Sequence, residues 1–155
     1  MDVALSPDGV SAVPGIARQL AGFAARKIWS SPAKRCLALA RAISTGTNAP
    51  KHRDDRLQEL DFGSWEGQRW DDVPRDALDR WGADPLGFAP PNGESGAALV
   101  ARLRSFQLHL IMERQDCVVV SHGGPLKVLV ALLRGSPVDL LAQAPSFGWI
   151  DIVTC

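Results

Sequence analysis

The segment Cys117-Val118-Val119-Val120-Ser121-His122-Gly123-Gly124-Pro125 decides the fold of this chain. Its opening apolar run predicts a strand over residues 117–121 that is buried on both faces, as strands of a parallel sheet are. The glycine pair and the proline then predict a turn, followed by a helix over residues 126–133. A buried strand that leads directly into a helix is the unit from which α/β folds are built.

Helices and strands alternate through the rest of the 155 residues. Ser6-Pro7-Asp8 predicts a helix start, and an apolar stripe continues it to about Ala25, with a kink or a later start at Pro14. The remaining predicted strands lie at 27–30 and 146–153, with an extended stretch at 56–62. The remaining predicted helices are one at 33–44, a short one at 76–81 and a long one from Ser95, and loops are predicted at 45–52 and 85–94. The pattern predicts one layered α/β domain with a mostly parallel sheet, whose chemistry lies at the carboxyl ends of the strands.

Composition and charge exclude several classes of protein. Hydrophobic residues make up 46% and charged residues 22%, which is typical of a globular domain. The formal net charge is zero, so no broad basic surface is expected for nucleic acid or an anionic membrane. No apolar run approaches the roughly 20 residues of a membrane span, and the start of the chain does not resemble a signal peptide. The three cysteines show no disulfide or metal spacing, so the prediction is a cytoplasmic protein.

The turn at His122 is the first candidate site. Two consecutive glycines let the backbone approach a ligand closely, and a helix N-terminus favours an anion. A histidine in this place can donate a hydrogen bond or exchange a proton near neutral pH. The alternative is a capped turn with a solvated histidine.

Two further segments contribute candidate residues. Arg35 follows the strand at 27–30 by one helical turn, from where a guanidinium reaches past the strand end and binds phosphate in a bidentate manner. Glu59, if held near a phosphate and shielded by an aromatic ring, has the raised pKa that protonation of a leaving alkoxide requires. The alternatives are a solvated arginine on a helix surface and a strand with alternating polar residues. Trp65, Trp70 and Trp81 either line a pocket for an aromatic base or are packing residues.

Five segments, taken in order, resemble the histidine phosphatase (phosphoglycerate mutase-like) superfamily. They are Leu5-Ser6-Pro7-Asp8-Gly9, Ser30-Ser31-Pro32-Ala33-Lys34-Arg35, the stretch from Leu57 to Gly67 that ends Phe-Gly-Ser-Trp-Glu-Gly, Pro91-Asn92-Gly93-Glu94-Ser95, and Ser121-His122-Gly123-Gly124. Each segment alone is weak, whereas five in the family's order are specific. The resemblance implies a three-layer αβα fold.

The resemblance also implies roles for individual residues. Arg35, His122 and Gly123 would bind the phosphoryl group, with His122 stabilising charge in the transition state, and Glu59 would donate the proton to the leaving group. No metal and no cofactor are implied, and the partner is a small phosphorylated substrate. Residues 69–81 are most similar to α-ribazole phosphatases, which act in cobalamin biosynthesis.

One family feature has no counterpart in this sequence. The family's first strand, which is central in the sheet, ends in an Arg-His motif whose histidine attacks phosphorus, and here Met1 stands just before the first helix. His52 and His109 do not follow predicted strands and are no substitutes. The expectation is a single domain over 1–155 that is incomplete at its N-terminus and belongs to a longer natural enzyme.

Other functions stay open on the sequence alone. A catalytically silent protein would keep Arg35 and His122 for phosphate binding, and a phosphoglycerate mutase would pass the phosphoryl group to another hydroxyl. A Rossmann-type binding domain is disfavoured, because no Gly-x-Gly-x-x-Gly motif follows a strand.

Overall fold

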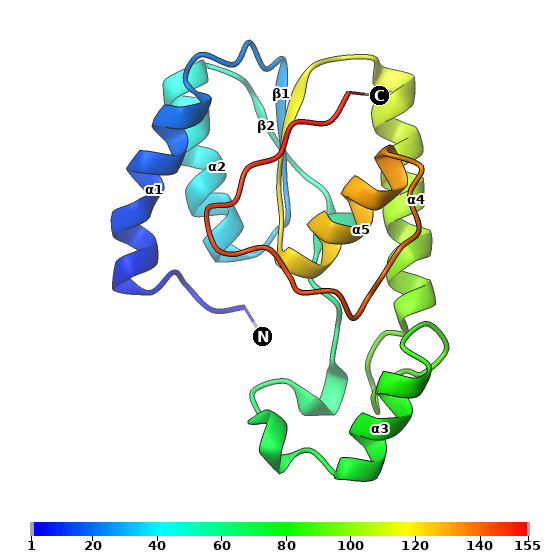
Figure 1. The fold of residues 1–155 in the computed structure, drawn as a ribbon. Helices are drawn as coiled ribbons and strands as arrows, with labels where there is room; N and C mark the ends of the chain where they lie inside the picture. Colours follow the sequence, from blue (N-terminus) through cyan, green and yellow to red (C-terminus); the bar gives the residue numbers. More distant parts are fainter. Residues whose placement is uncertain (1, 155) are drawn as a thin grey trace.

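Three parallel strands form the centre of the molecule (Figure 1). The computed structural model describes residues 2–154. The sheet order is β2-β1-β3, with β1 (Lys27–Ser30) in the middle, β2 (Lys51–Arg53) on one side and β3 (Cys117–Val120) on the other. The helices are α1 (Pro7–Leu20), α2 (Lys34–Thr47), α3 (Arg75–Ala83), α4 (Gly96–Glu113) and α5 (Gly123–Leu133). Among the described residues, no helix is long and apolar enough to cross a membrane.

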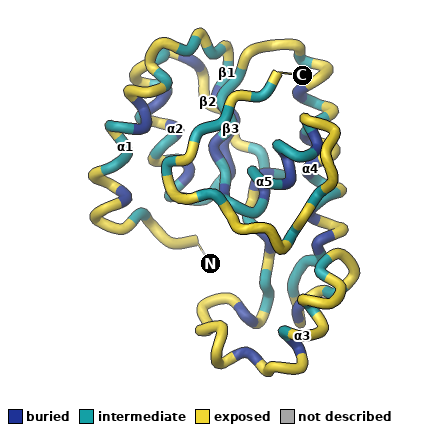
Figure 2. Tube along the Cα trace, in the orientation of Figure 1, coloured by how far each residue is buried: buried dark blue, intermediate teal, exposed yellow. Residues whose placement is uncertain are grey.

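Each face of the sheet carries its own hydrophobic core, so the fold has three layers. Alternate residues of a strand point to opposite faces, and Ile28 packs with α1 and α2 while Trp29 packs with α4 and α5. Phe106 of α4 and Ile28 are fully buried. Figure 2 shows the buried residues gathered along the strands and the inner sides of the helices. This arrangement confirms the predicted αβα architecture.

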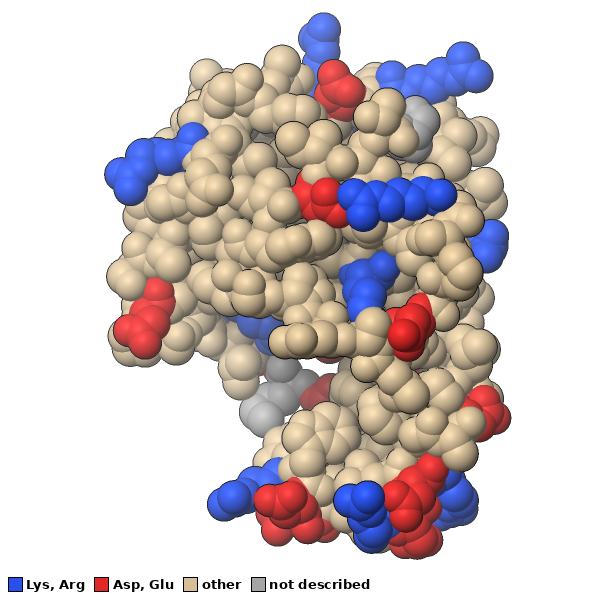
Figure 3. Space-filling model, viewed as in Figure 1, with Lys and Arg blue, Asp and Glu red and all other residues tan. Residues whose placement is uncertain are grey.

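A smaller lobe extends beyond the carboxyl ends of the strands. It contains α3 and two short 3₁₀ helices, η2 (Gly63–Trp65) and η3 (Trp70–Asp72), around a small core of Trp65, Val73 and Ala77 (Figure 1). The space-filling view shows a hollow between this lobe and the body of the molecule (Figure 3). The lobe therefore stands opposite the end of the sheet where α/β proteins place their chemistry.

The predicted final strand over residues 146–153 is wrong. These residues form an irregular coil, shown in red in Figure 1, although Asp151 holds the coil to α5 through a salt bridge of 2.8 Å from Arg134. Extended backbone becomes a strand only where a neighbour accepts its hydrogen bonds. The sheet of the described residues ends at β3, so the apolar side chains of Phe147, Trp149 and Ile152 stay exposed.

Other element boundaries also differ from the predictions. Residues 51–53, largely assigned to a loop, pair with β1 as β2, because β1 offers them a free edge. Residues 55–57 form a 3₁₀ helix, η1 (Asp55–Leu57), where extended chain was predicted. Helix α1 continues through Pro14, which lies on its exposed side, and ends at Leu20.

Candidate active site

The turns after β1 and β3 lie next to each other at the carboxyl end of the sheet. Ser31 directly follows β1, and its backbone N–H donates to the carbonyl of Val120, the last residue of β3, at 2.9 Å. Because β1 and β3 are parallel, the residues that follow them, Ser31 and His122, reach the same edge. The sheet thereby brings two segments of chain together that are 91 residues apart.

His122 is the centre of this edge. Its imidazole is only 8% exposed, and both ring nitrogens have partners. Ser31 Oγ lies 2.8 Å from Nε2, and a guanidinium nitrogen of Arg35 lies 2.9 Å from Nδ1. Arg35 is the second residue of α2, so the helix start directs its side chain across the strand ends.

Burial controls the protonation of the groups around His122. Desolvation, with a smaller contribution from the Arg35 charge, lowers the pKa of His122 to about 4. The Cys36 sulfur lies 3.7 Å from His122 Nε2, and burial raises the pKa of this thiol to about 11. Near neutral pH the imidazole is therefore uncharged and the thiol is protonated, so Arg35 carries the positive charge next to the ring.

Glu59 reaches the same turn from the segment after η1. Its Oε1 accepts from the backbone N–H of Leu60 at 3.0 Å, and its carboxylate also accepts from the N–H of Gly124 in the first turn of α5. A Cβ on Gly124 would stand 2.5 Å from Glu59 Oε1, so only glycine leaves the carboxylate its place. Burial raises the pKa of Glu59, which favours the protonated form that a proton donor needs.

Arg102 of α4 holds the segment that carries Glu59. The guanidinium forms a bidentate pair with the Glu94 carboxylate, with both distances 2.8 Å. It also donates to the carbonyl oxygens of Arg56, Gln58 and Glu59 at 2.6, 2.8 and 3.1 Å. Both side chains of the pair are about four-fifths buried. The backbone on either side of Glu59 is thus fixed to α4 and to the start of that helix.

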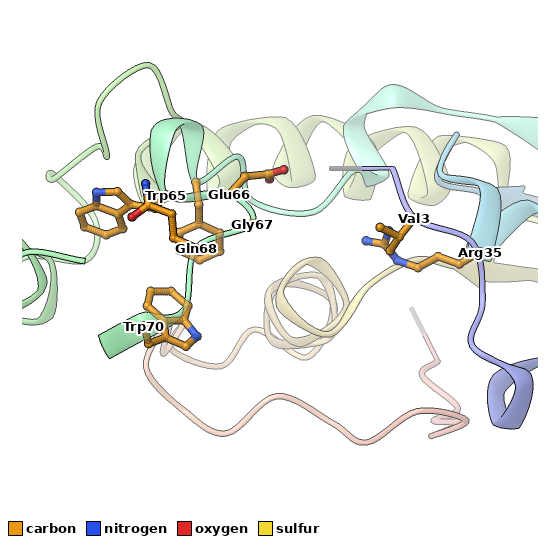
Figure 4. A pocket seen from close by; sticks show the side chains of 8 residues that line it. Val3, Arg35, Trp65, Glu66, Gly67, Gln68 and Trp70 are labelled. Carbon is orange, nitrogen blue, oxygen red and sulfur yellow. The ribbon is translucent and has the colours of Figure 1, made fainter. Parts of the chain in front are cut away.

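A cavity of about 290 Å³ opens between this edge and the lobe. Figure 4 shows Arg35 and Val3 on one side and the aromatic residues of the lobe on the other. The lining residues are Val3, Arg35, Phe62, Trp65, Glu66, Gly67, Gln68 and Trp70. Trp70 is 54% exposed, and its ring is held by Phe62, edge-on at 5.4 Å, and by stacking on Trp81 at 6.1 Å. The cavity has a cationic wall and an aromatic wall.

Comparison with known proteins agrees with this geometry. The model of the histidine phosphatase superfamily (branch 1) matches residues 1–146. The chain belongs to the histidine phosphatase superfamily. This membership confirms the resemblance that the five sequence segments carry.

Individual relatives of this chain carry different substrate names. Phosphoserine phosphatase 1 of Hydrogenobacter thermophilus is 33% identical over 155 residues, covering 96% of this chain and 71% of that protein. An adenosylcobalamin/α-ribazole phosphatase of Salmonella typhimurium is 29% identical over 116 residues, which cover 72% of this chain and 57% of that one. The crystal structure of a putative α-ribazole-5′-P phosphatase from Escherichia coli superposes with a TM-score of 0.82 at 27% identity, over 89% of this chain and 70% of that structure.

The site residues predicted from the sequence lie close together in the structure. Arg35 and His122 are in contact, Glu59 contacts the first turn of α5, and Gly123 starts that helix. By contrast, the ring centroids of His52, an exposed residue of β2, and of His109 in α4 each lie 5.1 Å from that of Trp29. Among the residues the structure describes, no three His, Cys, Asp or Glu side chains are grouped as a metal site requires.

Two polar residues of the site escaped the sequence interpretation. Ser31 belongs to the Ser-Ser-Pro segment, but nothing local distinguishes its hydroxyl from that of Ser30. Arg102 lies inside a helix, where an arginine is ordinarily a solvated residue. Ser31 contacts His122, which is 91 residues away in the sequence, and the partners of Arg102 are 8 to 46 residues away. Only the folded chain therefore identifies their roles.

The lowered pKa of His122 predicts a loss of stability in acid. The folded protein keeps the ring neutral down to about pH 4, whereas the unfolded chain takes up the proton near 6.5. The unfolded state therefore binds more protons in this window, and the free energy of unfolding falls as the pH drops from 6.5 to 4, by up to about 3 kcal/mol from this group. Glu59, whose pKa is raised, acts in the opposite direction. Urea unfolding between pH 6.5 and 4 tests this prediction. In His122→Asn the free energy of unfolding should fall less steeply with decreasing pH than in the wild type, and an equally steep fall would contradict the prediction.

Proposed function

We propose that this chain forms the phosphate-binding and proton-donating site of a metal-independent phosphomonoester hydrolase. One observation carries the proposal: a guanidinium and a buried carboxyl group meet the same turn at the N-terminus of α5. Arg35 contacts His122 Nδ1, and Glu59 accepts from the Gly124 N–H. A cation, helix N-terminal amides and a carboxyl group with a raised pKa are what phosphoryl binding and leaving-group protonation need.

Each residue has a defined part in the proposed reaction. Arg35 binds two phosphoryl oxygens through its planar fork. His122 and the amide of Gly123 face the same group and stabilise the charge that spreads over it in the transition state. Glu59 gives its proton to the alkoxide as the bond between phosphorus and the leaving oxygen breaks, and water then returns a proton to the carboxylate.

The proposed nucleophile is a second histidine. The family resemblance implies that it attacks phosphorus and forms a phosphohistidine, which water hydrolyses to inorganic phosphate. Within the sequence in hand, His122 is the histidine at this edge, and Ser31 and Arg35 occupy both of its nitrogens. We therefore assign His122 to phosphate binding and not to the attack on phosphorus.

We propose α-ribazole 5′-phosphate, an intermediate of cobalamin biosynthesis, as the substrate. The aromatic wall of the cavity supports it, because Phe62 and Trp70 stand opposite Arg35 and stack well on a planar base. Relatives that carry this substrate name support it too. Phosphoserine, the substrate in the names of other relatives, has no group that would use an aromatic wall.

A catalytically silent phosphate-binding protein is the second candidate. The observation in its favour is the same occupied imidazole: both nitrogens of His122 are engaged and the Cys36 thiol is protonated, so neither of these two side chains is a ready nucleophile. Such a protein would bind phosphate or a phosphorylated ligand and release it unchanged.

Turnover without added metal tests both candidates. We expect this chain to bind inorganic phosphate and to release no p-nitrophenol from p-nitrophenyl phosphate. The natural protein, expressed from its own gene, should hydrolyse this compound, and should hydrolyse α-ribazole 5′-phosphate faster than phosphoserine.

The outcomes separate the proposals. A natural protein that binds phosphate without turnover would leave the silent protein as the function. Release of p-nitrophenol by the present chain, lost in Arg35→Ala, would mean that a group other than the proposed histidine attacks phosphorus. Equal rates on both natural esters would overturn the substrate proposal alone.

A further inference from the structure

The two hydrogen bonds of His122 define its tautomer. A guanidinium has donors only, so Arg35 donates to Nδ1, and Nδ1 carries no proton. A neutral imidazole keeps one proton, which then stands on Nε2 and points to Ser31 Oγ at 2.8 Å. The backbone N–H of Ala33 also points to this oxygen, at 3.3 Å. Ser31 Oγ is thus placed as an acceptor for the ring.

This arrangement is buried and closely surrounded. Ser31 is completely buried, and the Cys36 thiol covers the ring from α2. The charges that act on the imidazole are those of Arg35 from α2, Arg102 from α4 and Asp2 from the N-terminal segment. Two of these three are positive, so the free site keeps the ring neutral. A bound anion reverses this balance, because an opposite charge favours the protonated ring.

A phosphate group changes what Nδ1 must do. Phosphate oxygens at neutral pH are mainly acceptors, so Arg35 turns its donors to them and leaves Nδ1. An unprotonated Nδ1 would then point its lone pair at the phosphate anion, which is repulsive. The ring faces the phosphate favourably only after Nδ1 takes a proton from solvent, while Nε2 keeps its own proton on Ser31.

We propose that Ser31 is the positioning residue of His122. Its hydroxyl accepts from Nε2–H in both the free and the phosphate-bound protein, so that Nδ1 gains a proton when phosphate replaces this nitrogen as the partner of Arg35. The inference rests on the proposed function, since it assumes that phosphate binds at this edge. It adds to that function a coupling: one proton enters the site with each phosphate. The hydroxyl of Ser31 fixes which nitrogen receives it.

Nitrogen NMR of the imidazole, together with calorimetry, tests the coupling on the full chain. In the free protein at neutral pH we expect a protonated Nε2 and an unprotonated Nδ1. With saturating inorganic phosphate both nitrogens should be protonated, and titrations in buffers of different ionisation enthalpy should give an uptake of about one proton. In Ser31→Ala the preference for Nε2–H should be lost and phosphate affinity should fall about tenfold, as for one hydrogen bond.

Ser30→Ala is the matched control, because Ser30 is equally buried but its hydroxyl donates to the Ser31 carbonyl. Ser30→Ala should leave the nitrogen chemical shifts of the His122 ring unchanged. Ser31→Thr keeps the hydroxyl and should show the wild-type chemical shifts. A proton on Nδ1 in the free protein would overturn the inference. Phosphate that binds without changing the protonation of the imidazole would overturn it too. Failure of phosphate to bind the wild-type chain would instead overturn the proposed function, and the coupling with it.

Discussion

Replacement of Arg35 by alanine is expected to weaken the binding of inorganic phosphate by about 100-fold. Arg35 is in contact with His122 and lies at the N-terminus of α2. Under the proposed function, its loss would remove a charge-assisted pair of hydrogen bonds to the phosphoryl oxygens. Such bonds contribute about 1.5–3 kcal/mol each, and a 100-fold loss corresponds to about 2.7 kcal/mol. Isothermal titration with phosphate, and with vanadate as a second ligand, measures the effect.

The same helix supplies the control. Arg41 is exposed on α2, and Arg41→Ala makes the same change of net charge away from the strand ends. Its phosphate affinity should stay close to that of the wild type. Arg35→Lys should fall between the two, because an ammonium keeps the charge but not the planar fork. Equal affinities of Arg35→Ala and Arg41→Ala would show that phosphate does not bind at this edge.

Arg102→Met is expected to lower the free energy of unfolding by about 3 kcal/mol. The substitution leaves the Glu94 carboxylate, four-fifths buried, without its bidentate partner, and leaves three backbone carbonyls without their donor. Removing one member of a largely buried ion pair costs about this much, because the remaining charge has lost its water and its counter-charge together. Urea unfolding followed by tryptophan fluorescence measures the change.

Arg104 gives the comparison within α4. It is exposed two residues further along, and Arg104→Met should change the free energy of unfolding by less than about 0.5 kcal/mol. Glu94→Gln keeps the shape of the pair and should cost less than Arg102→Met. If Arg102→Met unfolded at the urea concentration of Arg104→Met, the network around Glu59 would contribute nothing to stability.

The Arg102 network also connects stability to the site. It fixes the carbonyls of Gln58 and Glu59, and Glu59 is the residue whose carboxylate must meet the Gly124 N–H. The Pro-x-Gly-Glu-Ser segment, identified in the sequence as a helix start, therefore has a second part: its Glu94 orients the arginine that holds Glu59. A helix start and the proposed proton donor are joined through one guanidinium.

Local sequence determined most of the elements and the positions of the candidate residues. The apolar run before His122 predicted β3, and Ser6 and Ser95 predicted the starts of α1 and α4. A helix was predicted over 126–133 after a turn at the glycine pair, but α5 begins at Gly123 and includes both glycines and Pro125. These features follow from contacts within a few residues, through capping, side-chain period and backbone freedom. Arg35, His122 and Glu59 were selected because each lies within a segment that resembles the family.

Tertiary structure decided which segments and side chains pair with one another. Residues 51–53 became a strand because they pair with an edge of β1, whereas residues 146–153 pair with no strand of the described sheet and stayed coil. Ser31 and Arg102 became part of the site through partners on other elements, which no local pattern encodes. Hydrogen bonds between distant segments exist only after the chain has folded. The sequence by itself therefore selected Arg35, His122 and Glu59 as candidates, whereas the fold added Ser31 and Arg102 and determined the geometry, burial and protonation of the site.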